Sequence, residues 1–326
     1  MCIITRTRTR PALLKRAMES LGSQTFKDFV WIVADDSPGR SEVREALASA
    51  SDHGLIVRFC RATGMDGMER VANQALALAD GRYVTFLDDD DTWEPSFLQE
   101  TVAYLEDHPA SGGVCTQSHI VEETSDPVPA VLRKYVMNAD LQAIQIADMM
   151  LFNHLTTNSL VYRRTLHAEL GPYRDDLPVM GDWEFGLRLV SAHEVGVIAK
   201  PLANYHRRVD LTDPDHPHSN TVISRQQLHA QTDARLRNEM LRREWAEGNI
   251  GPGHLMAIGR MHLRADALAK FNLDAMVERI SALERSVDRL AARMEGLAEQ
   301  SDRMQHQMRD RLSPRWWIRR IVGRAG

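Results

Sequence analysis

The chain has 326 residues, of which 43% are hydrophobic and 26% charged, and its formal net charge is −5. At about 150 residues per domain this length predicts roughly two structural units. The composition excludes a collagen-like, low-complexity or wholly disordered chain, and the slightly acidic balance gives no indication of nucleic-acid binding. The three cysteines are far apart and form no CxxC pair, which argues against a disulfide scaffold or structural zinc site and indicates a reducing cytoplasm. These are Cys2, Cys60 and Cys115.

The first 110 residues alternate short apolar segments with amphipathic ones. Strands are predicted to begin at Ile3-Ile4 and to cover 29–34, 55–59 and 83–87, and helices are predicted over 13–21 and 71–79. Alternating strands and helices indicate βαβ units and a mainly parallel sheet. Aspartate-rich turns follow the second and fourth strands, at the carboxyl ends where such sheets bind ligands. Residues 1–110 therefore form one predicted half of an α/β domain that binds a ligand at this edge of the sheet.

The rest of the chain changes character twice. Residues 111–224 are rich in proline and predict a second, loop-rich half with one clear helix from Trp183 to about His193. Residues 225–272 predict a helical linker. From 273 to 312 apolar residues recur at alternating spacings of three and four, which favours a coiled coil and a homo-oligomer over the alternative of a long helix packed along the globular body. The heptad residues are Leu273, Met276, Ile280, Leu283, Val287, Leu290, Met294 and Leu297.

Residues 313–326, SPRWWIRRIVGRAG, carry four arginines and two tryptophans without an acidic residue. This composition is typical of a short amphipathic helix in the headgroup layer of an anionic membrane; the alternative is a solubilising tail. No run of apolar residues approaches the roughly 18 needed to span a bilayer, and the N-terminal sequence lacks the apolar region of a signal peptide. We therefore expect a cytoplasmic protein that associates peripherally with the inner face of the cell membrane.

Four consecutive aspartates, Asp88 to Asp91, follow the predicted fourth strand. In an extended chain alternate residues share a face, so Asp88 and Asp90 are expected to point together. Two neighbouring carboxylates repel each other unless a cation lies between them. Magnesium and manganese suit such oxygen ligands and commonly keep substrate phosphates in their shell. The alternative, a polar turn that caps the next helix, accounts for one aspartate and not for four.

Three segments, in this order, resemble glycosyltransferase family 2: IITRTRTRPALLKRAMESLGSQTFKDFVWIVADDSPG, RVANQALALADGRYVTFLDDDDTW and GPYRDDLPVMGDWEFGLRL. The resemblance covers about residues 1–210. It implies the α/β GT-A (Rossmann-like) fold, a mixed, mainly parallel sheet flanked by helices, here followed by the C-terminal helical region and coiled coil. It also implies a nucleotide-diphosphate sugar donor, Mn²⁺ or Mg²⁺, and transfer with inversion at the anomeric carbon.

The resemblance also implies roles for individual donor-side residues. Asp90 and Asp88 match the metal-binding DxD motif, with Asp88 also a ribose contact. His206 stands where relatives often have a polar residue near the diphosphate, so it is a candidate third metal ligand or, equally, a surface histidine. The remaining nucleotide-sugar candidates are Arg6, Thr7, Asp35, Asp36, Arg70 and Asp89. Arg6 replaces the proline of the family's Pro-Thr pair, and the alternative for Arg6 is a plain surface residue. Arg70 has the same alternative. For Asp35 and Asp36 the alternative is that they only cap the turn after the second strand.

The segment Gly181-Asp182-Trp183-Glu184 matches the family's ED-type motif. The resemblance makes Asp182 the general base, which the chemistry requires because an acceptor hydroxyl must lose its proton as it attacks the sugar. The alternative is a helix N-cap, a position that aspartate prefers. Trp183 and Glu184 are candidates for the acceptor site, and Gly181 departs from the usual glutamate.

The predicted function is metal-dependent, inverting transfer of a sugar to a hydroxyl of a glycan or lipid-linked acceptor, of the cell-surface polysaccharide or lipopolysaccharide type. One alternative is a sugar nucleotidylyltransferase, but the segment from Arg6 to Arg10 contains no glycine for a phosphate loop, and Asp182 would lack a role. Another is a non-catalytic coiled-coil scaffold with a degenerate sugar-nucleotide domain. The intact aspartates argue against it.

Overall fold

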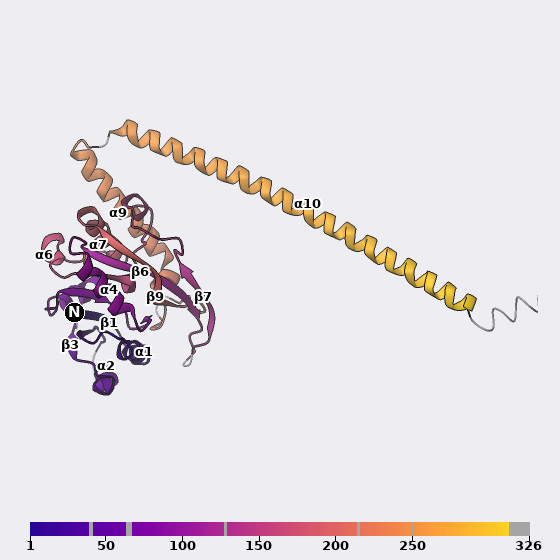
Figure 1. The fold of residues 1–326 in the computed structure, drawn as a ribbon. Helices are drawn as coiled ribbons and strands as arrows, with labels where there is room; N and C mark the ends of the chain where they lie inside the picture. Colours follow the sequence, from indigo (N-terminus) through magenta and orange to yellow (C-terminus); the bar gives the residue numbers. More distant parts are fainter. Residues whose placement is uncertain (39–41, 63–66, 127–128, 214–215, 250, 313–326) are drawn as a thin grey trace, which may run out of the picture. The chain divides into compact units, whose positions relative to one another are not determined.

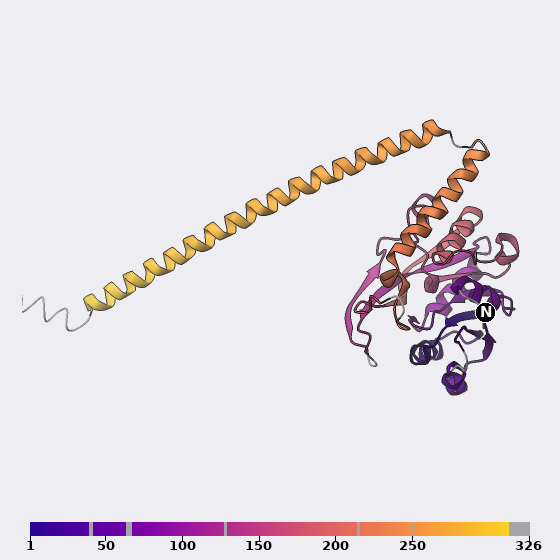
Figure 2. The ribbon, with the colours of Figure 1, turned by 180° about the vertical axis from the view of Figure 1, so that it is seen from behind.

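The computed structural model describes residues 1–38, 42–62, 67–126, 129–213, 216–249 and 251–312. It divides into two compact units, Met1–Glu239 and Met240–Gly326. The first unit is a curled sheet with helices around it, seen from two sides in Figures 1 and 2. Its described residues form one nine-stranded sheet, in the order β3-β2-β1-β4-β8-β6-β9-β5 with β7 paired to β6.

The N-terminal part of the sheet is parallel, as the sequence predicts. Strands β3, β2, β1 and β4 are neighbours in that order, and each pair among them is parallel. The buried strands β1, β2 and β4 fit a position covered on both faces, whereas β3 lies at the edge of the sheet and is only partly buried. The segments are β1 (Cys2–Thr7), α1 (Pro11–Gly22), β2 (Val30–Asp35), α2 (Val43–Ala46), a 3-10 helix (Leu47–His53), β3 (Val57–Arg61), α3 (Met68–Leu76) and β4 (Tyr83–Phe86).

The second part of the sheet is mixed and continues the first without a break. Strand β8 is antiparallel to both β4 and β6, and β6 is parallel to β9 from Gly113↔Val195 to Glu123↔Arg208. The predicted halves 1–110 and 111–224 thus share one sheet. The elements are β5 (Thr92–Trp93), α4 (Phe97–Asp107), β6 (Gly113–Glu123), β7 (Val131–Met137), α5 (Ile146–Met149), a 3-10 helix (Thr157–Ser159), β8 (Leu160–Arg163), α6 (Leu166–Leu170), α7 (Gly181–Ala192), β9 (Val195–Arg208), α8 (Thr221–Ser224) and α9 (Gln226–Ala246).

A buried polar relay ties three strands together just below the aspartate cluster. The Trp31 indole N–H donates to Thr5 Oγ1 (2.8 Å), and the Thr5 hydroxyl donates to the carbonyl of Leu87 (2.6 Å). All three residues are fully buried in the core that α1 covers with Leu14 and Leu21. Because a buried donor must be paired, this relay fixes the end of β4, and with it the start of the acidic segment.

The second unit contains one long helix, α10 (Pro252–Leu312), which is unbroken in Figure 1. It begins before the predicted boundary at residue 273, so part of the predicted linker belongs to the same helix. Its heptad residues are exposed in the single chain, with Leu283 at 65% and Leu290 at 60%. The predicted membrane tail, 313–326, lies outside the described residues. Within the described helices, none is long and apolar enough to cross a membrane.

Candidate active site

A cavity of about 590 Å³ lies where the first strands of the sheet end. The segments after β1 and β4 form one side, the starts of α3 and α7 another, and residues 219–229 a third. The predicted site residues that line it are Arg6, Thr7, Asp36, Asp88, Asp90, Asp182 and Trp183. Asp35, Arg70, Asp89, Glu184 and His206 are not among its lining residues.

Asp88 forms a two-pronged ion pair with Arg6. The guanidinium Nε and Nη2 of Arg6 donate to the two carboxylate oxygens of Asp88, at 2.9 and 2.7 Å. Both side chains are largely buried, and Arg6 stacks over the Phe86 ring at 5.6 Å. Arg6 is therefore not a free surface residue: its charge faces the cavity, bound to the first carboxylate of the acidic segment.

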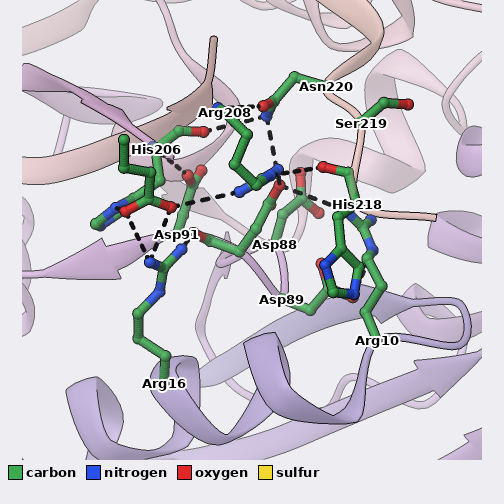
Figure 3. Close-up of polar contacts among 12 residues, drawn as sticks. Arg10, Arg16, Asp88, Asp89, Asp91, His206, Arg208, His218, Ser219 and Asn220 are labelled. Atoms are coloured by element: carbon green, nitrogen blue, oxygen red, sulfur yellow. Dashed lines mark hydrogen bonds and ion pairs between the residues drawn. The ribbon is translucent and has the colours of Figure 1, made fainter. Parts of the chain in front are cut away.

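Asp89 and Asp90 are buried against two further arginines, and Figure 3 shows Arg10 and Arg208 converging on this segment. Arg10 lies 3.1 Å from Asp89 Oδ2 and 3.4 Å from Asp90 Oδ2, and Arg208 donates to the same Asp90 oxygen. Burial raises the pKa of Asp89 to about 7. Burial also acts on Asp90, but the charges of Arg10 and Arg208 outweigh it and lower the pKa of Asp90 to about 2. Asp90 therefore stays ionised.

His206 lies behind the acidic segment and not in the cavity. Its ring Nδ1 is 2.9 Å from Glu123 Oε2, and its Nε2 is 3.0 Å from Thr92 Oγ1. Its backbone N–H donates to Asp91 Oδ1 at 3.0 Å. Burial lowers the pKa of His206, opposed by its hydrogen bond to Glu123. Both ring nitrogens are thus engaged, and the arrangement gives no support to His206 as a metal ligand.

The first aspartate pair lies at the end of β2, beside Thr7 of β1. Asp35 is fully buried; it accepts a hydrogen bond from Arg61 (2.6 Å) and one from the Ser37 backbone N–H (2.9 Å). Asp36 lines the cavity and pairs with Arg8 at 3.5 Å. The carboxylate of Asp35 therefore shapes the turn, as the capping alternative requires, while Asp36 faces the space that a ligand would fill.

Asp182 is held by neutral hydrogen-bond donors. The Asn153 amide and the Thr157 hydroxyl both donate to its Oδ2, each at 3.0 Å. The alternative role as an N-cap is wrong: the cap residue of α7 is Met180, in the left-handed conformation (φ 68°), and Asp182 lies within the first turn. The carboxylate lines the same cavity as the acidic segment after β4.

Two of the predicted site residues, Glu184 and Arg70, lie away from the cavity, and a third, Trp183, is mostly packed into the core. Glu184 is buried in an ion pair with Arg188 (2.7 Å), and Arg70 pairs with Asp175 at the surface (3.4 Å). Trp183 touches the cavity but is 2% exposed, and its indole N–H donates to the Met149 carbonyl (2.7 Å). The partners of these side chains are distant or local alternatives that the sequence alone does not distinguish.

The model of the family described as "Glycosyl transferase family 2" matches residues 2–170. This chain belongs to glycosyltransferase family 2. The amylovoran biosynthesis glycosyltransferase AmsB of Erwinia amylovora is 26% identical over 200 residues, 58% of this chain and 64% of that protein. The PGL/p-HBAD biosynthesis glycosyltransferase of Mycobacterium tuberculosis is 26% identical over 191 residues, 58% of this chain and 69% of that protein. The chain thus spans under two thirds of AmsB.

Solved structures agree on the fold. The crystal structure of S. aureus TarS 1-349 in complex with UDP-GlcNAc superimposes with a TM-score of 0.50 at 17% identity, over 67% of this chain and 60% of that one. At this identity the likeness shows the fold alone. The α/β GT-A fold expected from the sequence is confirmed.

The carboxylates in the cavity of this family 2 glycosyltransferase fit a divalent cation that also binds the phosphates of a ligand. Within the described ranges no three His, Cys, Asp or Glu side chains gather as a metal site. Asp88 and Asp90 nevertheless both face the cavity, and Asp90 is ionised. Magnesium is typically held by one or two carboxylates together with substrate phosphates. The two aspartates supply that protein share, provided that the cation competes with the arginines already bound to them.

Sequence reasoning missed several residues around the cavity. Arg10 and Arg208 neutralise the acidic segment, and Glu69 lies beside the start of α7. Arginines at every second position from Arg6 to Arg10, at the end of β1 and directly after it, are a usable signal, because side chains at that spacing share a face in an extended chain. Arg208 ends β9, 118 residues from Asp90, and no local pattern indicates that pairing.

Proposed function

We propose that this protein transfers a sugar from a nucleotide-diphosphate sugar to a hydroxyl of a glycan or lipid-linked acceptor, with inversion. The observation that carries the proposal is one cavity with two kinds of carboxylate: Asp88 and Asp90 among arginines on one wall, and Asp182 with neutral donors on another. The first wall suits a diphosphate and a cation, and the second suits a proton acceptor. The relatives' names and the TarS complex with UDP-GlcNAc support the same substrate class.

On the donor side, Asp90 and Asp88 would hold Mn²⁺ or Mg²⁺ together with the diphosphate. The bound ion would neutralise the phosphates and make the nucleoside diphosphate a better leaving group. Arg6 and Arg10 add positive charge on the same wall. Thr7 and Asp36 are the proposed nucleoside contacts, and Asp35 with Asp89 supports them from behind. Arg70 and His206 have no place in this scheme.

On the acceptor side, Asp182 takes the proton of the attacking hydroxyl. The acceptor oxygen forms its bond to the anomeric carbon as the bond from that carbon to the diphosphate oxygen breaks. The electron pair leaves with the nucleoside diphosphate, and the proton stays on Asp182. Because the nucleophile attacks the face opposite the leaving group, the configuration inverts. Asn153 and Thr157 keep the carboxylate oriented for this step.

The C-terminal unit would assemble and localise the enzyme. A stripe of exposed heptad residues along α10 is expected to pair with other copies of the chain, which would bury Leu283 and Leu290. The arginine-tryptophan tail at 313–326 would then bind the anionic inner face of the cell membrane, several tails together gaining by effective concentration. A membrane-presented acceptor such as a lipid-linked glycan fits this arrangement.

The catalytic proposal is tested by a hydrolysis screen of UDP- and GDP-sugars with Mn²⁺ or Mg²⁺. At least one donor should be hydrolysed, chelation should abolish turnover, and added metal should restore it. Asp90→Ala should lose metal-dependent donor binding. Glu106→Gln, a surface substitution on α4, is the control and should behave as wild type. Full activity in excess chelator removes the metal from the mechanism, and the absence of any nucleotide-sugar binding removes the proposal.

The assembly proposal is tested with two variants. Replacing Leu283 and Leu290 by aspartate should dissociate the oligomer in light scattering and weaken sedimentation with anionic liposomes. Deleting residues 313–326 should abolish sedimentation but leave the oligomeric state unchanged. A monomeric wild type, or a tail-deleted protein that still sediments fully, contradicts the model.

A further inference from the structure

Glu69 is a buried carboxylate on the cavity wall that the proposed mechanism does not use. It lies in the first turn of α3, is 4% exposed, and is one of the residues that line the cavity. Among the described residues, its Oε2 atom has no hydrogen-bond partner. Buried polar atoms are nearly always paired in native proteins, and one left unpaired in a cavity points to a ligand that completes it.

The space for Glu69 exists because residue 181 is glycine. A Cβ atom at Gly181 would lie 2.2 Å from Glu69 Cγ and 2.6 Å from Glu69 Oε1, far inside van der Waals contact. Gly181 does not have a positive φ, so backbone conformation does not demand a glycine there. The demand is steric: the missing side chain leaves room for the Glu69 carboxylate directly beside Asp182.

The charges around Glu69 agree with a place in the site. Burial raises the pKa of Glu69, the positive charge of Arg6 opposes the shift, and the negative charge of Asp182 adds to it. Glu69 is thus coupled to the arginine of the donor wall and to the proposed base. The acidic group beside Asp182 comes from α3, whereas Asp182 itself belongs to α7.

We propose that Glu69 binds a second hydroxyl of the sugar acceptor, next to the hydroxyl that Asp182 deprotonates. The substrate class is then a glycoside with two neighbouring hydroxyl groups, one of which attacks while the other hydrogen-bonds Glu69 Oε2. This inference rests on the proposed function. It makes Glu69 a specificity-determining residue on the acceptor side, with no part in nucleotide binding.

The experiment compares wild type with Glu69→Gln, using octyl glycosides as acceptors and UDP and GDP as binding probes. Glu69→Gln should raise the acceptor KM at least ten-fold, while nucleotide affinity and donor hydrolysis stay within two-fold of wild type. A glycoside that lacks the second hydroxyl should be equally poor for both proteins. The exposed Glu106→Gln is the matched control.

A swap of the carboxylate between helices gives a second, independent readout. Gly181→Glu alone should be defective, since its side chain collides with Glu69. The double variant Glu69→Gly with Gly181→Glu should return the acceptor KM to within about three-fold of wild type, because a carboxylate again enters the same space. A merely structural Glu69 would not be rescued in this way.

The outcomes separate the two levels of the proposal. A wild type that binds neither UDP nor GDP and hydrolyses no nucleotide sugar overturns the proposed function itself. A wild type that turns over a donor, with an unchanged acceptor KM in Glu69→Gln, overturns only the role of Glu69. The role of Glu69 is also overturned if Glu69→Gln loses nucleotide binding, because the carboxylate would then be structural. It is overturned as well if no octyl glycoside accepts the sugar or inhibits donor hydrolysis in the wild type.

Discussion

The two walls of the cavity hold their carboxylates in opposite ways. After β4, Asp88 and Asp90 accept charged donors from Arg6 and Arg208. At the start of α7, Asp182 accepts an amide and a hydroxyl, both at 3.0 Å. Ion pairs compensate the negative charge where it lies, whereas neutral donors orient a carboxylate and leave its charge in place.

This difference assigns separate tasks to residues of the same type. Carboxylates whose charge is neutralised by arginines, as in Asp88 and Asp90, tolerate burial. They can exchange an arginine for a ligand cation, so they suit binding. A carboxylate that is oriented by a neutral amide and a hydroxyl can accept a proton, so it suits chemistry. The comparison therefore predicts that substitutions on one wall change affinities and that substitutions on the other change turnover.

The largest effect is expected for Asp182→Asn. This variant keeps the shape and can still accept the hydrogen bonds from Asn153 and Thr157, but it cannot take a proton. The kcat should fall by about 10²-fold or more, with nucleotide affinity unchanged, as measured by steady-state kinetics and calorimetry. Turnover at the wild-type rate would show that Asp182 only stabilises the start of α7.

A smaller effect is expected for Arg6→Gln. Removing the Arg6 guanidinium removes the two hydrogen bonds that compete with a cation for Asp88. The affinity for Mn²⁺ should therefore rise by roughly five-fold, which corresponds to about 1 kcal/mol. Electron paramagnetic resonance of free Mn²⁺ measures this directly. The control is Arg61→Gln, which breaks the neighbouring ion pair with Asp35 outside the cavity. Equal Mn²⁺ affinities in wild type and Arg6→Gln would contradict the competition.

The third expected effect is on stability and not on activity, and it concerns the packing beneath the acceptor wall. His167 stacks on Phe185 of α7 at 5.0 Å, and burial, partly opposed by a hydrogen bond with Gly171, lowers the pKa of His167 to about 4. Because the folded pKa is below the ordinary value of about 6.5, this contribution to stability is complete above pH 6.5 and is lost as the pH falls towards 4.

We therefore expect the melting temperature to fall by roughly 2–4 °C per kcal/mol lost over that pH range. The decrease should be smaller in His167→Phe, which keeps the ring stack but cannot be protonated, and unchanged in His262→Gln on the exposed face of α10. Calorimetry at pH 4.5 and 7 measures it. Parallel pH profiles for wild type and His167→Phe would rule out this histidine as the source.

Features that depend on residues close together in the sequence could be predicted, and features that depend on distant residues could not. Strands β1 to β4 and helix α1 have apolar patterns that local spacing reveals. The four aspartates are consecutive in the sequence, so their clustering could also be predicted. The partners of that cluster do not: Arg10 is 80 residues from Asp90, and Arg208 is 118 residues away. Likewise His206 and Glu184 have suitable chemistry for the site, but Glu123 and Arg188 bind them elsewhere.

The close approach of Glu69 to Gly181 has a consequence for how this sequence can change over time. With glutamate at position 69, a Cβ atom at position 181 would lie 2.2 Å from the Glu69 Cγ, so we expect the two positions, 112 apart along the chain, to vary together. A lineage that moves the acidic group from one helix to the other must pass through an intermediate with both side chains or with neither. Related sequences should therefore carry a glutamate at one of these positions paired with a small residue at the other.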